Sequence, residues 1–351
     1  MNLRSKGFDG IIAVCALVLC GFGVAIVGSV ASSLVASQII FYAVGILLFF
    51  LFSRIDYRIF GNIWKQVYAV SLLLLITTLL VGLESRGATR WVSIFGFRLQ
   101  FSELLKPFIL TSLAVFLTEG KNSFKKYLLA AVLGIIPMLL IFKQPDLGSA
   151  LVYLAGFGTM IFLSGINLMY LIPVAAGGLV FLPIFWHFLA DYQKNRIFSF
   201  LNPASDPLGT SYNAIQATIA VGSGQFFGLG LGRGTQSQLL FLPEHHTDFV
   251  FASLAEELGF LGAGVLILVY FILIWRIFKI SERAPDKLGK ILAVSLAMML
   301  LGQIFINIGM NMGIVPVTGI TLPLVSYGGS SILATFITLG IIENIAYQTS
   351  F

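Results

Sequence analysis

Charged residues are scarce in this chain of 351 residues. Asp, Glu, Lys and Arg together make up 10% of the sequence, whereas apolar residues make up 58%. Soluble domains carry about 25% charged residues, which keep their surfaces in water. The low charge therefore excludes a soluble enzyme, and the high apolar content excludes a disordered chain. The sequence predicts a polytopic membrane protein.

Cysteine is also rare, since the chain contains only Cys15 and Cys20. Both lie in the first apolar run, and five positions of separation on one helix point them in different directions. We therefore expect neither a disulfide nor a metal site from them. No small-residue cleavage site follows the N-terminal segment MNLRSKGFDG, so we expect the first apolar run to remain as a membrane span.

Long apolar runs fill most of the remaining sequence. A helix that crosses a bilayer needs about 20 mostly apolar residues. The runs predict an all-α fold with ten transmembrane helices in one membrane domain over 1–351, and one long connection, 190–248, between the seventh and eighth spans. The predicted spans are 11–30, 38–53, 66–83, 102–118, 127–142, 146–164, 168–189, 249–275, 291–313 and 328–347.

Lysine and arginine are distributed unevenly among the connections between these spans. Most of them fall on the side that holds the N-terminus, and cytoplasmic connections carry the excess of basic residues in membrane proteins. We therefore expect a cytoplasmic N-terminus and, because the number of spans is even, a cytoplasmic C-terminus. The 190–248 connection then lies outside the cell membrane, where a connection of this length is usually functional.

Ionisable residues gather at the start of the fourth predicted span. Glu103 and Lys106 are three positions apart, so on a helix they share one face and can form an ion pair. Charges inside a span are costly and usually face a cavity or a partner. In the alternative interpretation, Ser102 caps the helix and Glu103 favours its positive N-terminal end.

Two arginines precede this pair in the connection between the third and fourth spans. Arg90 and Arg98, together with Lys106, could bind a diphosphate group through their positive charges at the outer surface of the membrane that the chain spans. The alternative is that both arginines only anchor the chain among lipid headgroups.

The segment LPEHHTDFVF, residues 242–251, closes the long connection. Asp248, with His246 beside it, could accept a proton from a hydroxyl group as a general base. Alternatively, Asp248 is a first-turn carboxylate that meets the dipole of a helix starting at Thr247. The order of these residues does not match a familiar zinc motif, so we expect no tightly bound metal here.

Two further stretches contain many glycines or prolines. Residues 222–234 lack the flanking features of a nucleotide-binding loop, so we expect a loop whose backbone approaches a ligand or a lipid headgroup. Residues 316–331, which include Ser326, predict irregular backbone that re-enters the membrane from its outer face. Such backbone must line a cavity or be buried in protein. Asp146, which follows Pro145, is interpreted as a helix cap.

Taken together, these motifs resemble the SEDS family (shape, elongation, division and sporulation). They occur in the family's order from the third span to the end of the chain. IDYR at 55–58 resembles the RodA branch more than the FtsW branch, and Phe101 departs from the proline usual at that position. The matching runs are GATRW (87–91), QFSELLK (100–106), QPDLGSA (144–150), NPASDPLGTSYNAIQ (202–216), the glycine-rich stretch, LPEHHTDFVF (242–251), EELGFLG (256–262) and PVTGITLPLVSYGGSS (316–331).

The resemblance implies a peptidoglycan glycosyltransferase in the bacterial cytoplasmic membrane. Its substrate would be lipid II, a disaccharide-peptide linked to undecaprenyl diphosphate, which it would polymerise for cell-wall synthesis. The family's essential aspartate falls on Asp248, and its other polar site residues fall on Arg90, Arg98, Glu103 and Lys106.

We expect Arg196, His246 and Ser326, which also lie on the outer side, to contribute to substrate binding. The resemblance implies a class B penicillin-binding protein, a transpeptidase, as the protein partner. Contacts with membrane lipid are expected, and contacts with nucleic acid are not. No tightly bound cofactor is expected, although a divalent cation (Mg²⁺ or Mn²⁺) would accompany the substrate diphosphate.

Two other functions are compatible with a polytopic membrane protein. A lipid II flippase or transporter would need alternating access, which predicts repeats and interrupted helices at the bilayer midplane. The sequence shows neither feature, and its unusual polar residues cluster on one side. A non-catalytic scaffold for a partner enzyme would give Asp248 no special role.

Overall fold

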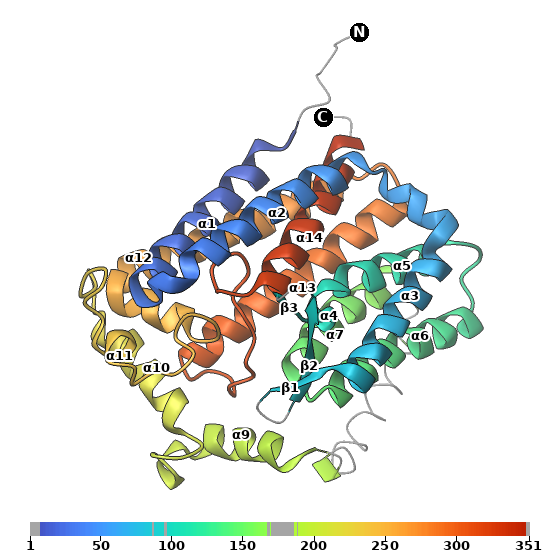
Figure 1. Ribbon diagram of the computed structural model, residues 1–351. Coiled ribbons are helices and arrows are strands. Elements are labelled where there is room, and N and C mark those ends of the chain that lie inside the picture. Colours follow the sequence, from blue (N-terminus) through green and yellow to red (C-terminus); the bar gives the residue numbers. More distant parts are fainter. Residues whose placement is uncertain are drawn as a thin grey trace.

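The apolar runs of the sequence fold into long helices that lie side by side (Figure 1). The computed structural model describes residues 8–85, 88–94, 97–166, 169, 186–187 and 189–348. A single-turn helix, α4 (Phe101–Leu104), runs almost directly into α5. The long helices are α1 (Gly10–Val30), α2 (Val35–Arg54), α3 (Phe60–Val81), α5 (Lys106–Thr118), α6 (Phe124–Lys143), α7 (Leu147–Leu163), α12 (Val250–Glu282), α13 (Lys287–Asn311) and α14 (Gly329–Gln348).

These helices match the predicted spans. Eight helical segments are long and apolar enough to cross a membrane, and α4 with α5 forms one of them. The apolar helix α7 adds a ninth with 17 residues, so nine of the ten predicted spans correspond to described helices. The remaining predicted span, 168–189, falls almost entirely outside the described residues. The chain is a multi-pass membrane protein.

The last helix, α14, occupies the interior of the bundle. In its most apolar 18-residue window, 94% of the residues are buried, against 22% in the windows of α2 and α3. Glycines bring α2 and α14 close together, because Gly45 faces the Phe336 ring and a Cβ atom on Gly340 would lie 2.7 Å from the Phe49 carbonyl oxygen. Small residues at helix contacts are typical of membrane bundles, in which backbones approach closely.

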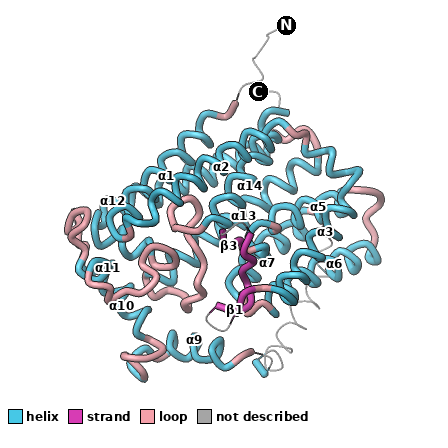
Figure 2. Tube along the Cα trace, viewed as in Figure 1, coloured by secondary structure: helices cyan, strands magenta, loops and turns pink. Residues whose placement is uncertain are grey.

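A three-stranded antiparallel sheet connects α3 to α4, and the sequence analysis did not predict it. Its strands are β1 (Leu83–Ser85), β2 (Ala88–Ile94) and β3 (Phe97–Leu99), in the order β1-β2-β3. Figure 2 shows these strands in magenta among the helices, where β2 contacts α3 and α4 and β3 contacts α14. The strands β1 and β3, with three residues each, are too short to show an alternating apolar pattern, and in β2 the apolar residues Trp91 and Val92 are adjacent, so the sequence carried no clear signal for the sheet.

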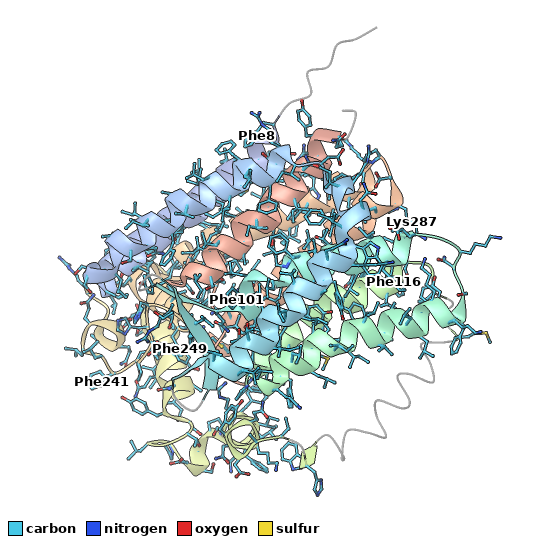
Figure 3. The ribbon with its side chains drawn as sticks, turned by 45° about the vertical axis from the view of Figure 1, so that its right-hand side comes forward. Phe8, Phe101, Phe116, Phe241, Phe249 and Lys287 are labelled. Carbon is cyan, nitrogen blue, oxygen red and sulfur yellow. The ribbon has the colours of Figure 1, made fainter. Side chains whose placement is uncertain are left out.

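The long connection before α12 contains three helices of its own. These are α9 (Asp191–Leu201), α10 (Tyr212–Ser223) and α11 (Thr235–Gln238). They lie at the end of the bundle away from the start of α1 and the end of α14 (Figure 1). Figure 3 shows the same separation for side chains, with Phe241 and Phe249 far from Phe8.

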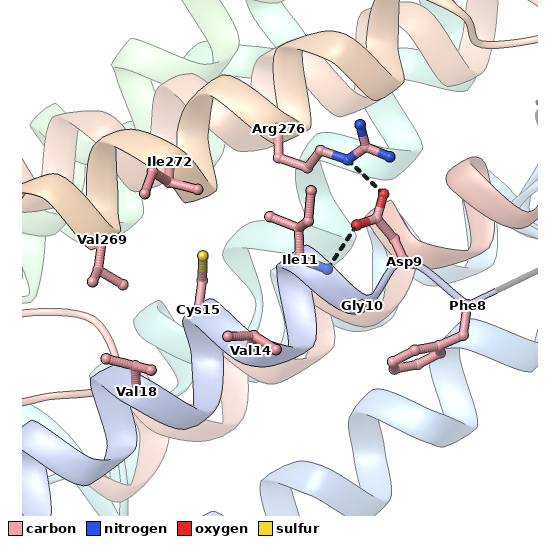
Figure 4. A pocket seen from close by; sticks show the side chains of 10 residues that line it. All are labelled: Phe8, Asp9, Gly10, Ile11, Val14, Cys15, Val18, Val269, Ile272 and Arg276. Carbon is pink, nitrogen blue, oxygen red and sulfur yellow. Dashed lines mark hydrogen bonds and ion pairs between the residues drawn. The ribbon is translucent and has the colours of Figure 1, made fainter.

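Polar contacts hold the two ends of the described chain together at the opposite end. The Asp9 carboxylate caps α1 and forms an ion pair with Arg276 on α12, with 2.7 Å between Oδ2 and Nε (Figure 4). The Asp9 backbone N–H donates to Glu343 Oε1 of α14 at 2.6 Å. A cavity of about 660 Å³ lies beside this cluster, between α1 and α12. Both ends of the described chain therefore lie on the same side of the bundle.

The glycine-rich stretch packs against a break in α12. At Gly259 the helix adopts φ 66° and ψ −167°, a conformation that is essentially restricted to glycine. Residues 225–230 form four backbone hydrogen bonds with residues 256–261 across the break. The loop thus satisfies peptide groups that the break leaves without helical partners. The predicted close approach of its backbone is present, with α12 as its partner, and the expected approach to a ligand or a lipid headgroup stays a prediction.

Two buried glutamates of α12 hold the loop segments beside this break. The Glu256 carboxylate accepts the Gln236 N–H at 2.8 Å and the Ser237 hydroxyl at 3.0 Å. The Glu257 carboxylate accepts the Ser29 hydroxyl from the end of α1 at 2.6 Å. The Gly232 N–H also donates to Glu257, at 3.1 Å. Buried carboxylates are stable only with such partners, so the two glutamates fasten the loop segments and the end of α1 to α12.

We predict that Gly259→Ala destabilises the protein. A side chain there would force an unfavourable φ and would place Cβ 2.7 Å from the Phe226 carbonyl oxygen, which together should cost about 1–3 kcal/mol. Thermal unfolding in detergent measures this loss. The control is Gly264→Ala in the same helix, where a Cβ atom meets open space and stability should be unchanged or slightly higher. Equal effects of the two substitutions would contradict this account of the break.

Candidate active site

The predicted pair at the start of the fourth span is present and buried. Lys106 Nζ lies 2.6 Å from Glu103 Oε1, and Ser149 Oγ of α7 donates to the same oxygen at 2.7 Å. The alternative that Ser102 caps this helix is wrong, because the N-cap residue is Gln100. The Ser102 hydroxyl instead points to Asp146, with 3.4 Å between Ser102 Oγ and Oδ2.

Asp146 is the N-cap of α7, as predicted from the sequence. Its Oδ1 accepts the Ser149 N–H at 3.0 Å, and its Oδ2 accepts Gln100 Nε2 at 2.6 Å. Arg90 also lies close to it, with 4.0 Å between Nη1 and Oδ1. This buried carboxylate therefore links the start of α7 to the segment before α4 and to the sheet that carries Arg90.

The sheet directs Arg90 toward the end of α6. Arg90 Nε donates to the Gln144 carbonyl at 3.0 Å, and Nη2 donates to the Pro145 carbonyl. Tyr192 of α9 donates its hydroxyl to the same Pro145 carbonyl at 2.9 Å. By contrast, Arg98 is exposed on β3 and has no ion-pair partner among the described residues. Arg90 therefore contacts Asp146 and the carbonyls at the end of α6, whereas Arg98 takes no part in these contacts.

Arg196 reaches the same region from α9. Its Nη1 donates to the Thr318 carbonyl at 3.1 Å, and its guanidinium lies 5.5 Å from the centre of the Tyr192 ring. Burial and the neighbouring positive charge of Arg90 lower the pKa of Arg196, whereas the charges of Asp248 and Asp146 oppose that shift. The positive charges of Arg90 and Arg196 repel each other at this partly buried site. A bound anion would reduce the repulsion, so the site favours an anionic ligand.

Asp248 lies in the turn directly before α12. Its backbone carbonyl accepts two side-chain amides of α13, from Asn307 at 2.9 Å and from Asn311 at 3.0 Å. Its carboxylate lies beside Gly319, because a Cβ atom on that glycine would be 3.3 Å from Asp248 Oδ2. The side chain thus belongs to the region that also contains Arg196 and Thr318.

The structure corrects the interpretation of Asp248 as a carboxylate in the first turn of a helix that starts at Thr247. The helix α12 begins at Val250 and its N-cap residue is Phe249. The Ala252 N–H of its first turn donates to Asn311 Oδ1 of α13 at 3.0 Å, so α13 supplies the cap.

Residues 313–328 form irregular backbone between α13 and α14, as predicted for the re-entrant segment. Ser326 Oγ accepts the Leu322 N–H at 2.8 Å and donates to the Thr247 carbonyl at 2.6 Å. The Tyr327 N–H donates to the His246 carbonyl at 2.9 Å. Ser326 and His246 therefore connect the re-entrant segment to the turn that carries Asp248. Their expected contacts with substrate stay predictions.

Three further residues of this region, the two asparagines of α13 and Tyr192, were not predicted from the sequence. Polar side chains within an apolar span are costly and mark contacts with protein or water. Asn307 and Asn311 are four positions apart and lie on one helix face, so their pattern was visible in the sequence. The role of Tyr192 had no such signal, because it depends on α9 packing beside the end of α6.

Comparison with known proteins places these features in a family. The family profile named for FtsW, RodA and SpoVE, and described as "Cell cycle protein", matches residues 10–351. The chain belongs to the FtsW/RodA/SpoVE family. This finding confirms the resemblance to the SEDS family seen in the motifs.

Curated relatives of this FtsW/RodA/SpoVE chain cover most of its length. Peptidoglycan glycosyltransferase MrdB of Escherichia coli K12 is 41% identical over 307 residues, which are 86% of this chain and 83% of MrdB. Stage V sporulation protein E of Bacillus subtilis is 37% identical over 318 residues, or 88% of this chain and 86% of the relative.

Solved structures of family proteins share its fold. A chain from a peptidoglycan synthase complex, studied for the coordination of polymerization and crosslinking, has 31% identity and a TM-score of 0.83. The match covers 97% of this chain and 98% of the other. The rod shape determining protein RodA of Thermus thermophilus has 29% identity and a TM-score of 0.74, with 97% of each chain covered.

For this FtsW/RodA/SpoVE protein we predict that Glu103 and Lys106 act as one unit. Glu103→Gln or Lys106→Met alone leaves one charge buried without its partner and should lower the free energy of unfolding by about 3–5 kcal/mol. The double variant should be no less stable than the worse single variant. Thermal unfolding in detergent measures the three changes as a double-mutant cycle.

The control cycle uses Lys279 and Glu282, which have the same spacing and an N–O distance of 2.9 Å but are exposed to 40% and 61%. Substitutions in that pair should change stability by about 1 kcal/mol or less. Additive losses at Glu103 and Lys106 would contradict the coupling.

Proposed function

We propose that this protein is a peptidoglycan glycosyltransferase that polymerises lipid II at the outer face of the bacterial cytoplasmic membrane, with both termini in the cytoplasm. The observation that carries the proposal is that Asp248, Arg196 and Arg90 converge on neighbouring segments. Arg196 donates to the Thr318 carbonyl, and a Cβ atom on the adjacent Gly319 would lie 3.3 Å from Asp248 Oδ2. Arg90 and Tyr192 donate to the same Pro145 carbonyl, and the Tyr192 ring lies beside Arg196. The names of the relatives MrdB and FtsW, both peptidoglycan glycosyltransferases, support the same activity.

The reaction needs a base and a stabiliser of negative charge. The 4-hydroxyl of the acceptor sugar attacks the anomeric carbon of the donor sugar, and the bond between that carbon and the diphosphate oxygen breaks. Asp248 accepts the proton of the attacking hydroxyl. The undecaprenyl diphosphate leaves with the bonding electron pair, and Arg90 and Arg196 stabilise its charge.

The fixed backbone of Asp248 serves this chemistry. Hydrogen bonds from Asn307 and Asn311 hold its carbonyl to α13, and Ser326 holds the neighbouring Thr247 carbonyl. A base that is already positioned costs little reorganisation in the transition state. Two lipid-linked substrates that enter from the same membrane surface supply much of the remaining orientation.

The buried pair Glu103 and Lys106 would act through its neighbours. Glu103 accepts the Ser149 hydroxyl, and the Ser149 N–H donates to Asp146, which in turn lies beside Arg90. Because the pair is buried, we infer that it positions Arg90 rather than contacting the diphosphate itself. Arg98, which is exposed, would meet the substrate or the lipid headgroups farther out.

A divalent cation has no evident protein site here. Among the described residues, no three His, Cys, Asp or Glu side chains lie close enough together to hold a metal ion. The residues present therefore do not fit a tightly bound ion, and any Mg²⁺ or Mn²⁺ would be carried by the substrate diphosphate. No step above depends on such an ion.

We further propose a class B penicillin-binding transpeptidase as partner. The structural relative from a peptidoglycan synthase complex supports this assignment, because that complex coordinates polymerization and crosslinking. A flippase is less well supported. Alternating access uses helix breaks near the bilayer midplane, whereas the break in α12 lies only nine residues after the helix begins at Val250.

We predict that Asp248→Asn lowers the rate of glycan polymerisation by about 10²–10⁴, because asparagine keeps the shape but cannot accept the proton. The assay uses purified protein with its transpeptidase partner and labelled lipid II in detergent. Thermal stability should be unchanged, since the backbone carbonyl of Asp248 makes the contacts with α13.

The matched control is Asp191→Asn, an exposed aspartate at the start of α9, which should polymerise at the normal rate. Near-normal polymerisation by Asp248→Asn would refute the assignment of the base. Transfer of lipid II across liposome membranes without any polymer, in the unaltered protein, would instead favour a flippase.

A further inference from the structure

A cavity of about 370 Å³ adjoins the cationic side of the proposed site. It lies between α9, α10 and the segment 312–317 that follows α13. Arg196 is the one charged residue among the described residues that line it. Most of the remaining wall is apolar, and its larger side chains are Phe200, Ile215, Ile219, Met312, Val315 and Val317.

Arg196 belongs to both the cavity and the proposed site. Its Nη1 group donates to the Thr318 carbonyl, one residue beyond the cavity wall at Val317. The charges of Asp248 and Arg90 also act on it, so its guanidinium marks the boundary between the cavity and the catalytic region. A ligand that occupies both spaces must have an anionic group at Arg196 and an apolar chain next to it.

The far side of the cavity is open. Thr218 and Ile219 on α10 are both exposed, Ile219 to 45%. These two residues lie at the end of the bundle where α9 and α10 are found (Figure 1). A chain too long for the cavity can therefore leave past α10. This opening excludes a ligand that must be fully enclosed, and it suits a long lipid of which only the first part is bound.

We propose that this cavity binds the first isoprene units of the lipid-linked diphosphate donor, with the diphosphate at Arg196 and the remaining prenyl chain leaving past Thr218 and Ile219. The inference rests on the proposed function and adds a site for the lipid portion of its substrate. Pockets of about 300–1,000 Å³ with mostly apolar walls and a few polar groups are typical of small-ligand sites, and here the ligand portion would be the diphosphate with its first isoprene units.

The assignment has a consequence for product release. After glycosyl transfer, the undecaprenyl diphosphate still carries the two groups that Arg196 and the cavity hold. Burial of the isoprene units adds to the electrostatic attraction, so prenyl diphosphates should bind more tightly than inorganic diphosphate. The cavity would thus slow the departure of the leaving lipid.

The test compares two soluble probes, farnesyl diphosphate and inorganic diphosphate, binding to the full-length protein in nanodiscs. In the unaltered protein, farnesyl diphosphate should bind at least about tenfold more tightly. Ala214→Phe, which fills the cavity from α10, should remove most of this preference and leave the affinity for inorganic diphosphate unchanged. Arg196→Gln should weaken the binding of both probes by a similar factor.

A matched control adds the same bulk elsewhere. Leu201→Phe alters a residue of α9 that is 71% exposed and does not line the cavity, so it should leave both affinities unchanged. Thr218→Phe narrows the cavity at a second position and replaces Ala214→Phe if that variant unfolds.

Three results would overturn the proposal. One is an unchanged preference for farnesyl diphosphate in folded Ala214→Phe and Thr218→Phe, and another is no preference in the unaltered protein. The third is that phosphatidylglycerol displaces bound farnesyl diphosphate as effectively as unlabelled farnesyl diphosphate does. That result would indicate a general lipid site. The ratio of the affinities for farnesyl diphosphate and inorganic diphosphate does not depend on turnover. A protein that fails to polymerise lipid II would contradict the proposed function, and this failure is distinguishable from all three results.

Discussion

Inside a membrane bundle, backbone that is not helical must find hydrogen-bond partners in the protein, because lipid offers none. The turn before α12 meets this requirement through side chains of other elements. Asn307 and Asn311 bind the Asp248 carbonyl, and Ser326 binds the Thr247 carbonyl. The position of the carboxylate follows from these contacts, since a turn without them would be free to shift. The geometry of the whole candidate site depends on these hydrogen bonds to the turn before α12.

The same constraint explains polar residues that carry no chemistry. The break at Gly259 exposes peptide groups, and the glycine-rich loop approaches closely enough to bind them. Glu256 accepts donors from the segment after that loop, where a neutral side chain of similar size would bind fewer of them. A glycine-rich or acidic motif in a membrane protein can therefore be structural, even where its residues suggest a ligand site.

Much of the fold and part of the site could be predicted from the sequence, because those features depend on local spacing. Apolar runs indicated the helices, and three positions between Glu103 and Lys106 indicated their pair. The sheet that carries Arg90 could not be predicted, since two of its strands have only three residues and the apolar residues of β2 do not alternate with polar ones. The meeting of Arg196 with Arg90 could not be predicted either, because it requires α9 and the sheet to converge across more than a hundred residues of chain. The interpretation of Asp248 as a residue in the first turn of a helix was wrong, because α12 begins at Val250, two residues after Asp248.

The burial of α14 bears on how the protein is made. This helix leaves the ribosome after all the other described helices, yet it fills the interior of the bundle and packs against α2, which is synthesised much earlier. Until α14 arrives, the close-packed glycine surface of α2 lacks its partner, and the Ser53 carbonyl lacks the Asn344 amide that binds it at 2.8 Å. Chains that stop early would therefore present an unfilled groove to the bilayer and to the proteases that remove incomplete membrane proteins. The order of synthesis makes the arrival of α14 a condition for closing the bundle.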